Sequence, residues 1–528
     1  MIARLRALIT PLNAVFVLEI ILFVLIVLGI IPRQAALWLG SGLALYTLLA
    51  PIEDALNLFV RSIPLFLALP LTPTFDNFNT WRILSLILFG RWLWQYGNKQ
   101  QATRYYDLFR RILRSKTAIA LITLFLIAII SVFVAPDKIV AIKRIIYFLN
   151  LSLIGFIIYD LVCRGSLVAG RLVKSIATAT VLAITAGYIQ VIATYFIDIY
   201  QFMRVWGEGI QMRQFGAVWS DIAVRLGNTW FAYYGDQLSL RVFSLFPDSH
   251  SFPIFVLLGI PALFAVATRK ISSLGLSLKQ LVRTRPTLFI LWVPLAFLIA
   301  ILSGTRGIWA ASIGVVVLAV LMALYARKEG VSRERRALFS YTSSFLVLFF
   351  MLFSLAYPIF TSPQFLLSKG DWSLLAGRIR SIIDFGETSN AQRIEIWKKS
   401  ISSIKEHPLL GVGIGNFPVV LDQKIFLAKA GSSAHNIYLN IAAEIGVLGL
   451  IISIWLLWRL FSTAYKNFVA TKDASLAVYF GALVLYIPWV MAYSLTDVAL
   501  FDERAFLLFV VTVGLVADVK ENGTISSR

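Results

Sequence analysis

The sequence predicts an all-α integral membrane protein, a polytopic bundle of about 12–14 transmembrane helices with a large loop on its outer face. Hydrophobic residues make up 59% of the 528 residues, charged residues only 14%, and the mean hydropathy is +0.82. An ordinary soluble domain has about 25% charged residues. Apolar runs of membrane-spanning length follow one another through residues 14–519. These observations exclude the soluble enzyme classes.

The individual spans are placed by apolar runs of about 17–25 residues. The first run, residues 14–31, follows Arg4 and Arg6 as a signal peptide would, but no small-residue cleavage site comes after it, so we expect a transmembrane helix. The other predicted spans are residues 35–50, 56–72, 82–96, 117–135, 140–163, 171–197, 252–269, 287–303, 307–326, 339–358, 436–459, 476–495 and 504–519.

The spans and the segments between them divide the chain into six parts. These are N-terminal transmembrane helices (1–200), an outer-face segment (201–251), transmembrane helices with an SGTRG turn (252–358), a large outer loop (359–434), C-terminal transmembrane helices (435–519) and a cytoplasmic tail (520–528). Long loops in compact proteins are usually functional. Any chemistry is therefore expected on the outer side.

Loop charge predicts the orientation. The loops at residues 97–116, 163–174, 269–286 and 327–337 are rich in lysine and arginine, and all four lie on one side if about fourteen spans are counted. The positive-inside rule assigns that side, and both termini, to the cytoplasm. The net charge of +21 is then largely a topological signal. We expect a lipid bilayer and no nucleic acid as a partner.

Several site types are excluded by missing residues. No DxD or DDxxD motif occurs, the three histidines are not spaced as metal ligands, and Cys163 is the single cysteine. The glycine-rich run GVGIGNF (411–417) has no strand and no βαβ unit around it, so we interpret it as a glycine turn. We expect neither a metal nor a cofactor, and no intramolecular disulfide.

Two arginines at outer membrane ends are candidate anion ligands. Arg306 lies in the turn LSGTRGIWAA between two apolar runs, against the charge bias of the other loops, and the arginine fork suits phosphate oxygens. The alternative is an anchor at the membrane interface. Arg241 opens RVFSLFPDSHSF just before the next span, and its alternative is a helix-end residue or a salt bridge with Asp248.

Two further candidates flank the large loop. His435 stands at the outer mouth of a span in SSAHNIYLNIAAEIGVLGLI, where its alternative is a capping or packing residue. Arg393 belongs to an amphipathic segment, AQRIEIWKKSISSIKEHPLLGVGIGNF, and its alternative is a solvated helix arginine.

Four motifs, in this order, resemble the O-antigen ligase and O-antigen polymerase superfamily. RVFSLFPDSHSF resembles the family stretch R-x-x-S-x-F-x-x-P-N-x-x-A, with Ser249 in place of the proline and His250 in place of the asparagine. SGTRG resembles S-x-S-R-G. The run HNIYLNIAAEIGVLGL resembles the family signature HN-x-x-L-x-x-x-x-E-x-G-x-x-G. The preceding R-x-x-x-W element, followed by HPLLGVGIGNF, resembles the family's approach to that signature across the large outer loop. The motifs cover residues 240–460 and do not separate ligase from polymerase.

The resemblance implies a glycosyltransferase of cell-surface polysaccharide assembly in the bacterial cytoplasmic membrane. Such a protein moves a glycan from undecaprenyl pyrophosphate to a hydroxyl of a glycan, lipid or protein acceptor at the outer face, with inversion and without a metal. It implies that His435 is the general base, that Arg241 and Arg306 hold the pyrophosphate, and that Arg393 orients the loop or substrate. We interpret Glu444 first as a buried helix-packing acid and second as an indirect contributor to the site.

A multi-span transporter or flippase of lipid-linked oligosaccharides is the alternative. A flippase is expected to place charged residues along a pathway at the membrane midplane. The candidate residues here stand at outer membrane ends instead, and a loop of about 75 residues is unusual for a carrier. The sequence therefore favours the transferase.

Overall fold

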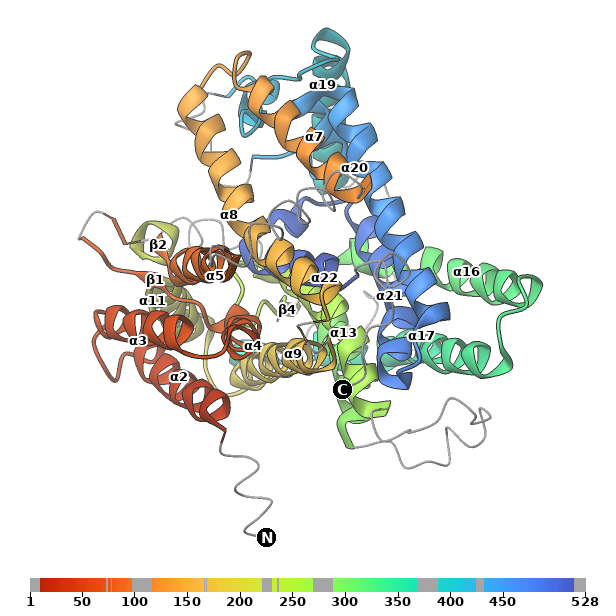
Figure 1. The fold of residues 1–528 in the computed structure, drawn as a ribbon. Helices are drawn as coiled ribbons and strands as arrows, with labels where there is room; N and C mark the ends of the chain where they lie inside the picture. Colours follow the sequence, from red (N-terminus) through yellow and green to blue (C-terminus); the bar gives the residue numbers. More distant parts are fainter. Residues whose placement is uncertain are drawn as a thin grey trace.

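The computed structural model describes residues 10–72, 75–76, 78–96, 116–165, 167, 169–220, 230–234, 237–268, 288–367, 388–423 and 432–516. Within these residues the protein is almost entirely helical, with two short antiparallel hairpins (Figure 1). The prediction of an all-α polytopic membrane protein is confirmed. Seven of the described helices are long and apolar enough to cross a membrane.

Each predicted span overlaps a helix. In the N-terminal half these are α2 (Pro11–Val27), α3 (Ala35–Leu49), α4 (Ile52–Ser62), α5 (Thr80–Tyr96), α7 (Lys116–Ser131), α8 (Lys138–Cys163) and α9 (Ala169–Ala193). In the C-terminal half they are α13 (Ser251–Thr268), α15 (Trp292–Leu302) after the short η5 (Leu288–Leu291), α16 (Arg306–Lys328), α17 (Arg333–Phe360), α20 (Ile437–Ala470), α21 (Ala474–Tyr493) and α22 (Glu503–Leu515).

The predicted span at residues 56–72 is wrong. Helix α4 ends at Ser62, and the chain continues through η1 (Ile63–Leu65) into strand β1 (Ala68–Leu69), which pairs with β2 (Phe78–Asn79). Pro64 lacks an amide N–H and disfavours a continuous helix. The apolar residues that mimic a span in the sequence, 63–69, are buried inside the protein. Hydropathy alone does not separate such a core segment from a lipid-facing one.

Helices α13 and α21 form the centre of the bundle and pack against each other. In the most apolar part of α13, 94% of the residues are buried, and in α21 83% are buried, whereas only 33% are buried in α16. A helix that is apolar on all sides and buried on all sides belongs in the interior of a large protein. These two helices therefore fix the positions of the turns at their ends.

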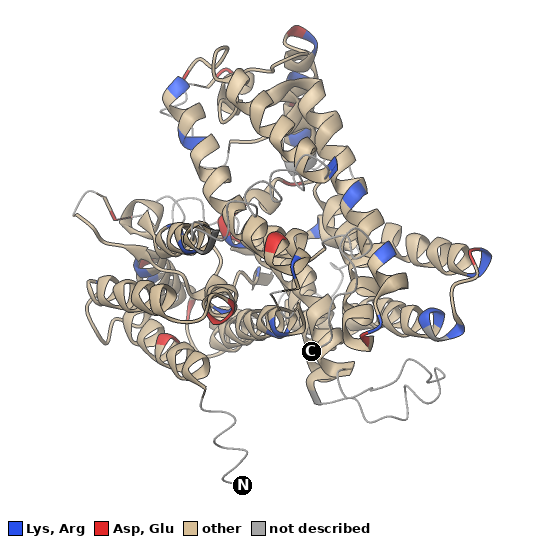
Figure 2. Cartoon of the chain, in the orientation of Figure 1, with Lys and Arg blue, Asp and Glu red and all other residues tan. Residues whose placement is uncertain are grey.

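Several shorter elements lie between the predicted spans. They are α10 (Ile199–Phe202), η3 (Met203–Gln211), α11 (Met212–Phe215), the hairpin of β3 (Phe231–Tyr234) and β4 (Gln237–Leu240), η6 (Gln364–Leu366), α19 (Thr388–Glu406), η8 (Phe417–Leu421) and η9 (Ala499–Phe501). Charged residues stand mainly at helix ends and turns, for example where α16 and α17 meet, and the long helices between them are mostly uncharged (Figure 2).

Two contacts join helix ends that the predicted topology assigns to the cytoplasm. Arg335, at the start of α17, donates to the carbonyl oxygens of Phe468 (2.6 Å) and Thr471 at the end of α20. Ser475, at the start of α21, donates to the carbonyl oxygen of Ala265 near the end of α13, at 2.7 Å. Each contact joins two helix ends that lie on the same side of the membrane in the predicted alternation of spans.

Candidate active site

The turn that joins α15 to α16 meets the segment before α13. The amide of Val242 donates to the carbonyl oxygen of Leu302 at 3.1 Å, and the Nε of Arg241 donates to the carbonyl oxygen of Ser303 at 3.3 Å. Thr305 closes the other end of this contact, because its hydroxyl donates to the carbonyl oxygen of Ser249 at 2.8 Å. The structure thus brings together the two motifs that carry Arg241 and Arg306.

Arg306 is the first residue of α16 and is half-buried. The glycines on either side of Thr305–Arg306 allow close packing. A Cβ at Gly304, whose φ is +64°, would lie 2.9 Å from the hydroxyl of Tyr234, and a Cβ at Gly307 would lie 2.2 Å from the hydroxyl of Thr496. The SGTRG turn is therefore enclosed by the β3–β4 hairpin and the turn after α21.

His435 does not cap helix α20. The capping residue is Asn436, whose side chain accepts hydrogen bonds from the amides of Tyr438 (3.0 Å) and Leu439 (3.1 Å). His435 precedes the cap in the left-handed region, with φ +46°, and its side chain is 39% exposed. The capping alternative is wrong because the neighbouring asparagine already satisfies the first amides of the helix.

A chain of polar contacts connects Arg241 to His435. The Nη2 of Arg241 is 3.3 Å from Nε2 of His250, and Nδ1 of His250 is 3.2 Å from Oδ2 of Asp497. The same carboxylate oxygen lies 3.7 Å from Nδ1 of His435. The hydroxyl of Tyr493 completes the cluster at 3.1 Å from Nδ1 of His250. One carboxylate thus faces both imidazoles.

The surroundings favour an ionised Asp497 and a neutral His250. Burial by itself raises the pKa of Asp497, but the facing His250, His435 and Arg393 lower it by more, and the net pKa falls well below the usual range. Burial lowers the pKa of His250, and Arg241 and Arg393 act in the same direction against the opposing effect of Asp497. Among the described residues no group of three or more histidines, cysteines and acids could hold a metal ion.

Arg393 reaches this cluster from helix α19. One helical turn after it, the indole of Trp397 donates to the carbonyl oxygen of Ala434 at 2.9 Å, immediately before His435. Residues four apart lie on the same side of a helix. The tryptophan therefore holds α19 against the His435 segment and brings Arg393, which is half-buried, within electrostatic range of Asp497.

Comparison with known protein families identifies part of the chain. Residues 291–454, from the start of α15 into α20, match the family described as O-antigen ligase. This match covers less than a third of the chain. It confirms the resemblance seen in the motifs. The match includes Arg306, Arg393 and His435, and it leaves Arg241 and Asp497 outside. No curated protein matches the chain.

Glu444, inside the matched residues 291–454, has a structural position. Its buried carboxylate accepts hydrogen bonds from the amides of Gly415 and Phe417 and from the side chain of Asn440. It therefore fastens the glycine-rich segment GVGIGNF to α20. These contacts are those of a packing acid, the first of the two interpretations of Glu444.

The glycines of the signature interrupt helix α20, and this interruption lets the glycine-rich segment GVGIGNF and the residues before it cross the helix. The helix leaves helical geometry at Ile445 and Gly446, where Gly446 has φ +79° and ψ 174°. A Cβ at Gly446 would lie 2.1 Å from the carbonyl oxygen of Leu409. The freed backbone groups pair with the crossing segment, since the amide of Val412 donates to Ala443 and the amide of Val447 donates to Pro408, both at 2.8 Å.

Sequence reasoning missed Asp497 and underrated His250. Asp497 lies in the short turn between α21 and α22, outside the matched domain, and no motif marks it. The available signal was the single charged residue within YSLTDVALF, between two predicted spans. His250 was treated as a departure from the family motif, whereas the structure gives it contacts to Arg241, Tyr493 and Asp497.

Proposed function

We propose that this protein transfers a glycan from undecaprenyl pyrophosphate to an acceptor hydroxyl at the outer face of the bacterial cytoplasmic membrane, with inversion and without a metal. The observation that carries the proposal is the continuous set of contacts from Arg241 through His250 and Asp497 to His435, beside the SGTRG turn. It joins cations suited to a pyrophosphate with an imidazole suited to proton transfer.

His435 acts as the general base. The carboxylate of Asp497 faces Nδ1, which favours the tautomer with a proton on Nδ1 and leaves the lone pair on Nε2. As the acceptor oxygen forms its bond to the anomeric carbon, Nε2 takes the hydroxyl proton. The bond from that carbon to the pyrophosphate oxygen breaks with its electron pair. Attack opposite the leaving group inverts the anomeric centre.

The arginines replace the metal that many glycosyltransferases use. Negative charge grows on the departing pyrophosphate, and two unit charges 4 Å apart attract by about 4 kcal/mol at an effective dielectric of about 20, before desolvation. Arg306 opens helix α16, whose N-terminal amides also favour an anion. Arg241 is aligned by Ser303 and His250, and this alignment limits the reorganisation needed during the reaction.

A purified and reconstituted protein tests the function. We expect glycan transfer from a synthetic undecaprenyl-pyrophosphate glycan to an added acceptor, undiminished by EDTA. A strain lacking the gene separates the finer alternatives. Single repeat units on the outer-leaflet carrier indicate a polymerase, and full-length polymer on that carrier indicates a ligase. Carrier-linked glycan retained on the cytoplasmic leaflet indicates a flippase and contradicts the proposal.

The outer-face assignment is tested by cysteine labelling. Cys163→Ser provides a cysteine-free background, since Cys163 is the single cysteine. In that background a membrane-impermeant maleimide, added to spheroplasts, should label Gln201→Cys and leave Glu329→Cys unlabelled until the membrane is opened. Both positions are exposed, so accessibility of the side chain is matched. Labelling in the reverse pattern contradicts an outer-face site.

A further inference from the structure

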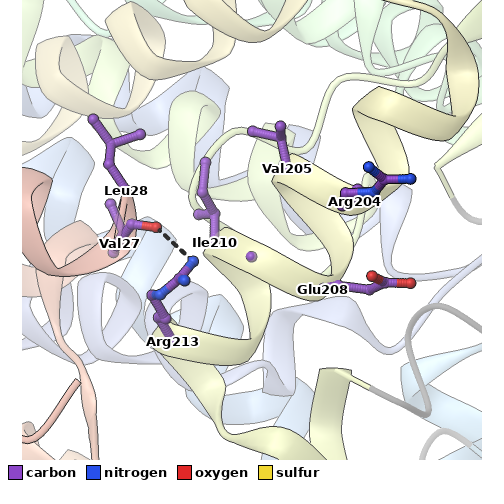
Figure 3. Close-up of a pocket in the computed structure, with 8 residues that line it drawn as sticks. Val27, Leu28, Arg204, Val205, Glu208, Ile210 and Arg213 are labelled. Carbon is purple, nitrogen blue, oxygen red and sulfur yellow. Dashed lines mark hydrogen bonds between the residues drawn. The ribbon is translucent and has the colours of Figure 1, made fainter. Parts of the chain in front are cut away.

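A second charged site lies apart from the His435 cluster, at the end of α2. It is a pocket of about 370 Å³ between the last turn of α2 and the elements η3 and α11 (Figure 3). Arg204 and Glu208 come from η3, Arg213 comes from α11, and Val27 and Leu28 supply the apolar wall from α2. Neither the glycan-transfer chemistry nor the motifs use these residues.

Among the residues that the structure describes, Arg213 uses one of its five N–H donors in a hydrogen bond. One Nη donates a long hydrogen bond of 3.4 Å to the carbonyl oxygen of Val27, where α2 ends. The guanidinium lies against two glycines, because a Cβ at Gly29 would be 2.5 Å from Nη2 and a Cβ at Gly209 would be 3.3 Å from Nη1. A guanidinium has five N–H donors in a planar fork that matches phosphate oxygens.

The backbone of the pocket is unusual. Residues Met203–Gln211 form a π-helix. Such helices are rare, normally a single turn, and frequently occur at functional sites. In Figure 3, Arg204 and Glu208 project from the same side of this helix, and Arg213 points toward the end of α2. Within the part of the chain that the structure describes, neither Arg204 nor Glu208 forms an ion pair.

The surroundings fit a membrane interface. Large apolar side chains next to the pocket are exposed, with Leu28 at 54%, Ile30 at 65% and Val205 at 43%. Exposed apolar side chains at the end of a span, with cations at their edge, match the boundary between acyl chains and headgroups. A pocket of this volume suits a headgroup rather than a whole lipid.

We propose that this pocket binds the phosphate headgroup of an outer-leaflet membrane lipid. Arg213 donates to the phosphate oxygens, and the acyl chains run along Leu28 and Val205. Glu208 faces the far side of the headgroup, where a carboxylate matches an ammonium group, so a phosphoethanolamine lipid fits better than a purely anionic one. The same phosphate chemistry is present in the undecaprenyl pyrophosphate carrier, and the test separates the two sources.

Native mass spectrometry of the purified full-length protein, titrated with phosphatidylethanolamine, phosphatidylglycerol or undecaprenyl pyrophosphate, tests the proposal. We expect Arg213→Gln to weaken phosphatidylethanolamine binding roughly ten-fold, as for the loss of charge-assisted hydrogen bonds. Glu208→Gln should remove the preference for phosphatidylethanolamine over phosphatidylglycerol. Arg327→Gln, an exposed arginine at the end of α16, is the matched control and should bind as the wild type does.

Two results overturn the proposal. The first is equal phosphatidylethanolamine binding by Arg213→Gln and the wild type, which reduces Arg213 to a cap of α2. The second is a loss confined to undecaprenyl pyrophosphate, which assigns the pocket to the carrier. If Arg213→Gln does not fold, Arg204→Gln and Arg213→Lys are titrated with the same lipids. Both variants are then expected to bind phosphatidylethanolamine more weakly than the wild type does. Lipid binding is measured without any glycan transfer, so the outcome is independent of the proposed activity.

Discussion

Oδ2 of Asp497 lies 3.7 Å from Nδ1 of His435, although helices α20 and α21 separate the two residues in the chain. The ends of those helices are tied together, because the amide of Ile437 donates to the carbonyl oxygen of Ser494 at 2.8 Å. The position of the acid relative to the imidazole therefore depends on backbone contacts as well as side chains. This arrangement can orient a histidine for proton transfer.

Asp497→Asn should lower the turnover number roughly 100-fold while the protein still folds. The asparagine keeps an acceptor for the amide of Ala499, which Asp497 binds at 3.0 Å, and loses only the charge that faces His435. Steady-state transfer by the reconstituted enzyme measures the turnover number, and thermal unfolding checks the fold. Wild-type turnover in a folded Asp497→Asn protein contradicts the orienting role.

His435→Asn should abolish transfer and leave binding of the pyrophosphate carrier largely intact, because the cations rather than the imidazole hold the phosphates. Asparagine tolerates the left-handed backbone at this position, where φ is +46°. His435→Ala should be equally inactive and also less stable by about 1 kcal/mol. An active His435→Asn enzyme would remove the base assignment.

Arg306→Lys should reduce transfer roughly ten-fold or more, because lysine keeps the charge but not the bidentate fork. The control is Arg327→Lys in the last turn of the same helix, on an exposed side chain, and it should have no effect. Transfer rates and carrier affinity are measured side by side. If Arg306→Ala were as active as the wild type, Arg306 would be an interface anchor, the alternative that the sequence left open.

His250 should make the stability of the protein fall as the medium becomes acidic. Its pKa is lowered in the folded state by burial, whereas the unfolded chain takes up the proton below about pH 6.5. The stability contribution is therefore complete above about pH 6.5 and is lost as the pH falls below it. The lowered pKa of Asp497 has the same sign but acts only below about pH 4.

Melting temperatures in detergent from pH 8 to pH 5 measure this effect. His250→Asn should flatten the dependence, since asparagine does not titrate. His407→Asn, at an exposed histidine, should keep the wild-type slope. Identical slopes for His250→Asn and the wild type would show that His250 is not the group responsible.

Gly446→Ala should destabilise the protein by more than about 2 kcal/mol, because the backbone has φ +79° and the new Cβ would contact the carbonyl oxygen of Leu409. The control is Gly42→Ala in α3, where a Cβ meets nothing within 4 Å. That change should be neutral or stabilising by up to about 1 kcal/mol. Equal melting temperatures for the two variants would contradict the crossing of α20 by the glycine-rich segment.

The sequence by itself selected most of the residues that form the candidate site. Arg306 was selected because its positive charge departs from the predicted loop bias, and Arg241 because it stands just before a predicted span. Their motifs do meet in the structure. His435 was selected from its motif, and the adjacent Asn436 excludes the capping alternative. The roles of these residues in transfer stay predictions.

The orientation that the loop charges give stays a prediction. Apolar runs by themselves determined where most of the long helices lie in the chain, because a span is a local property of about twenty residues. They failed at residues 63–69, where apolar residues face protein rather than lipid. Only the tertiary structure decided the partners of Asp497 and His250 and the break in α20 at Gly446. Those features depend on which helix ends meet after α13 and α21 pack together, and that packing joins residues that are distant in the sequence.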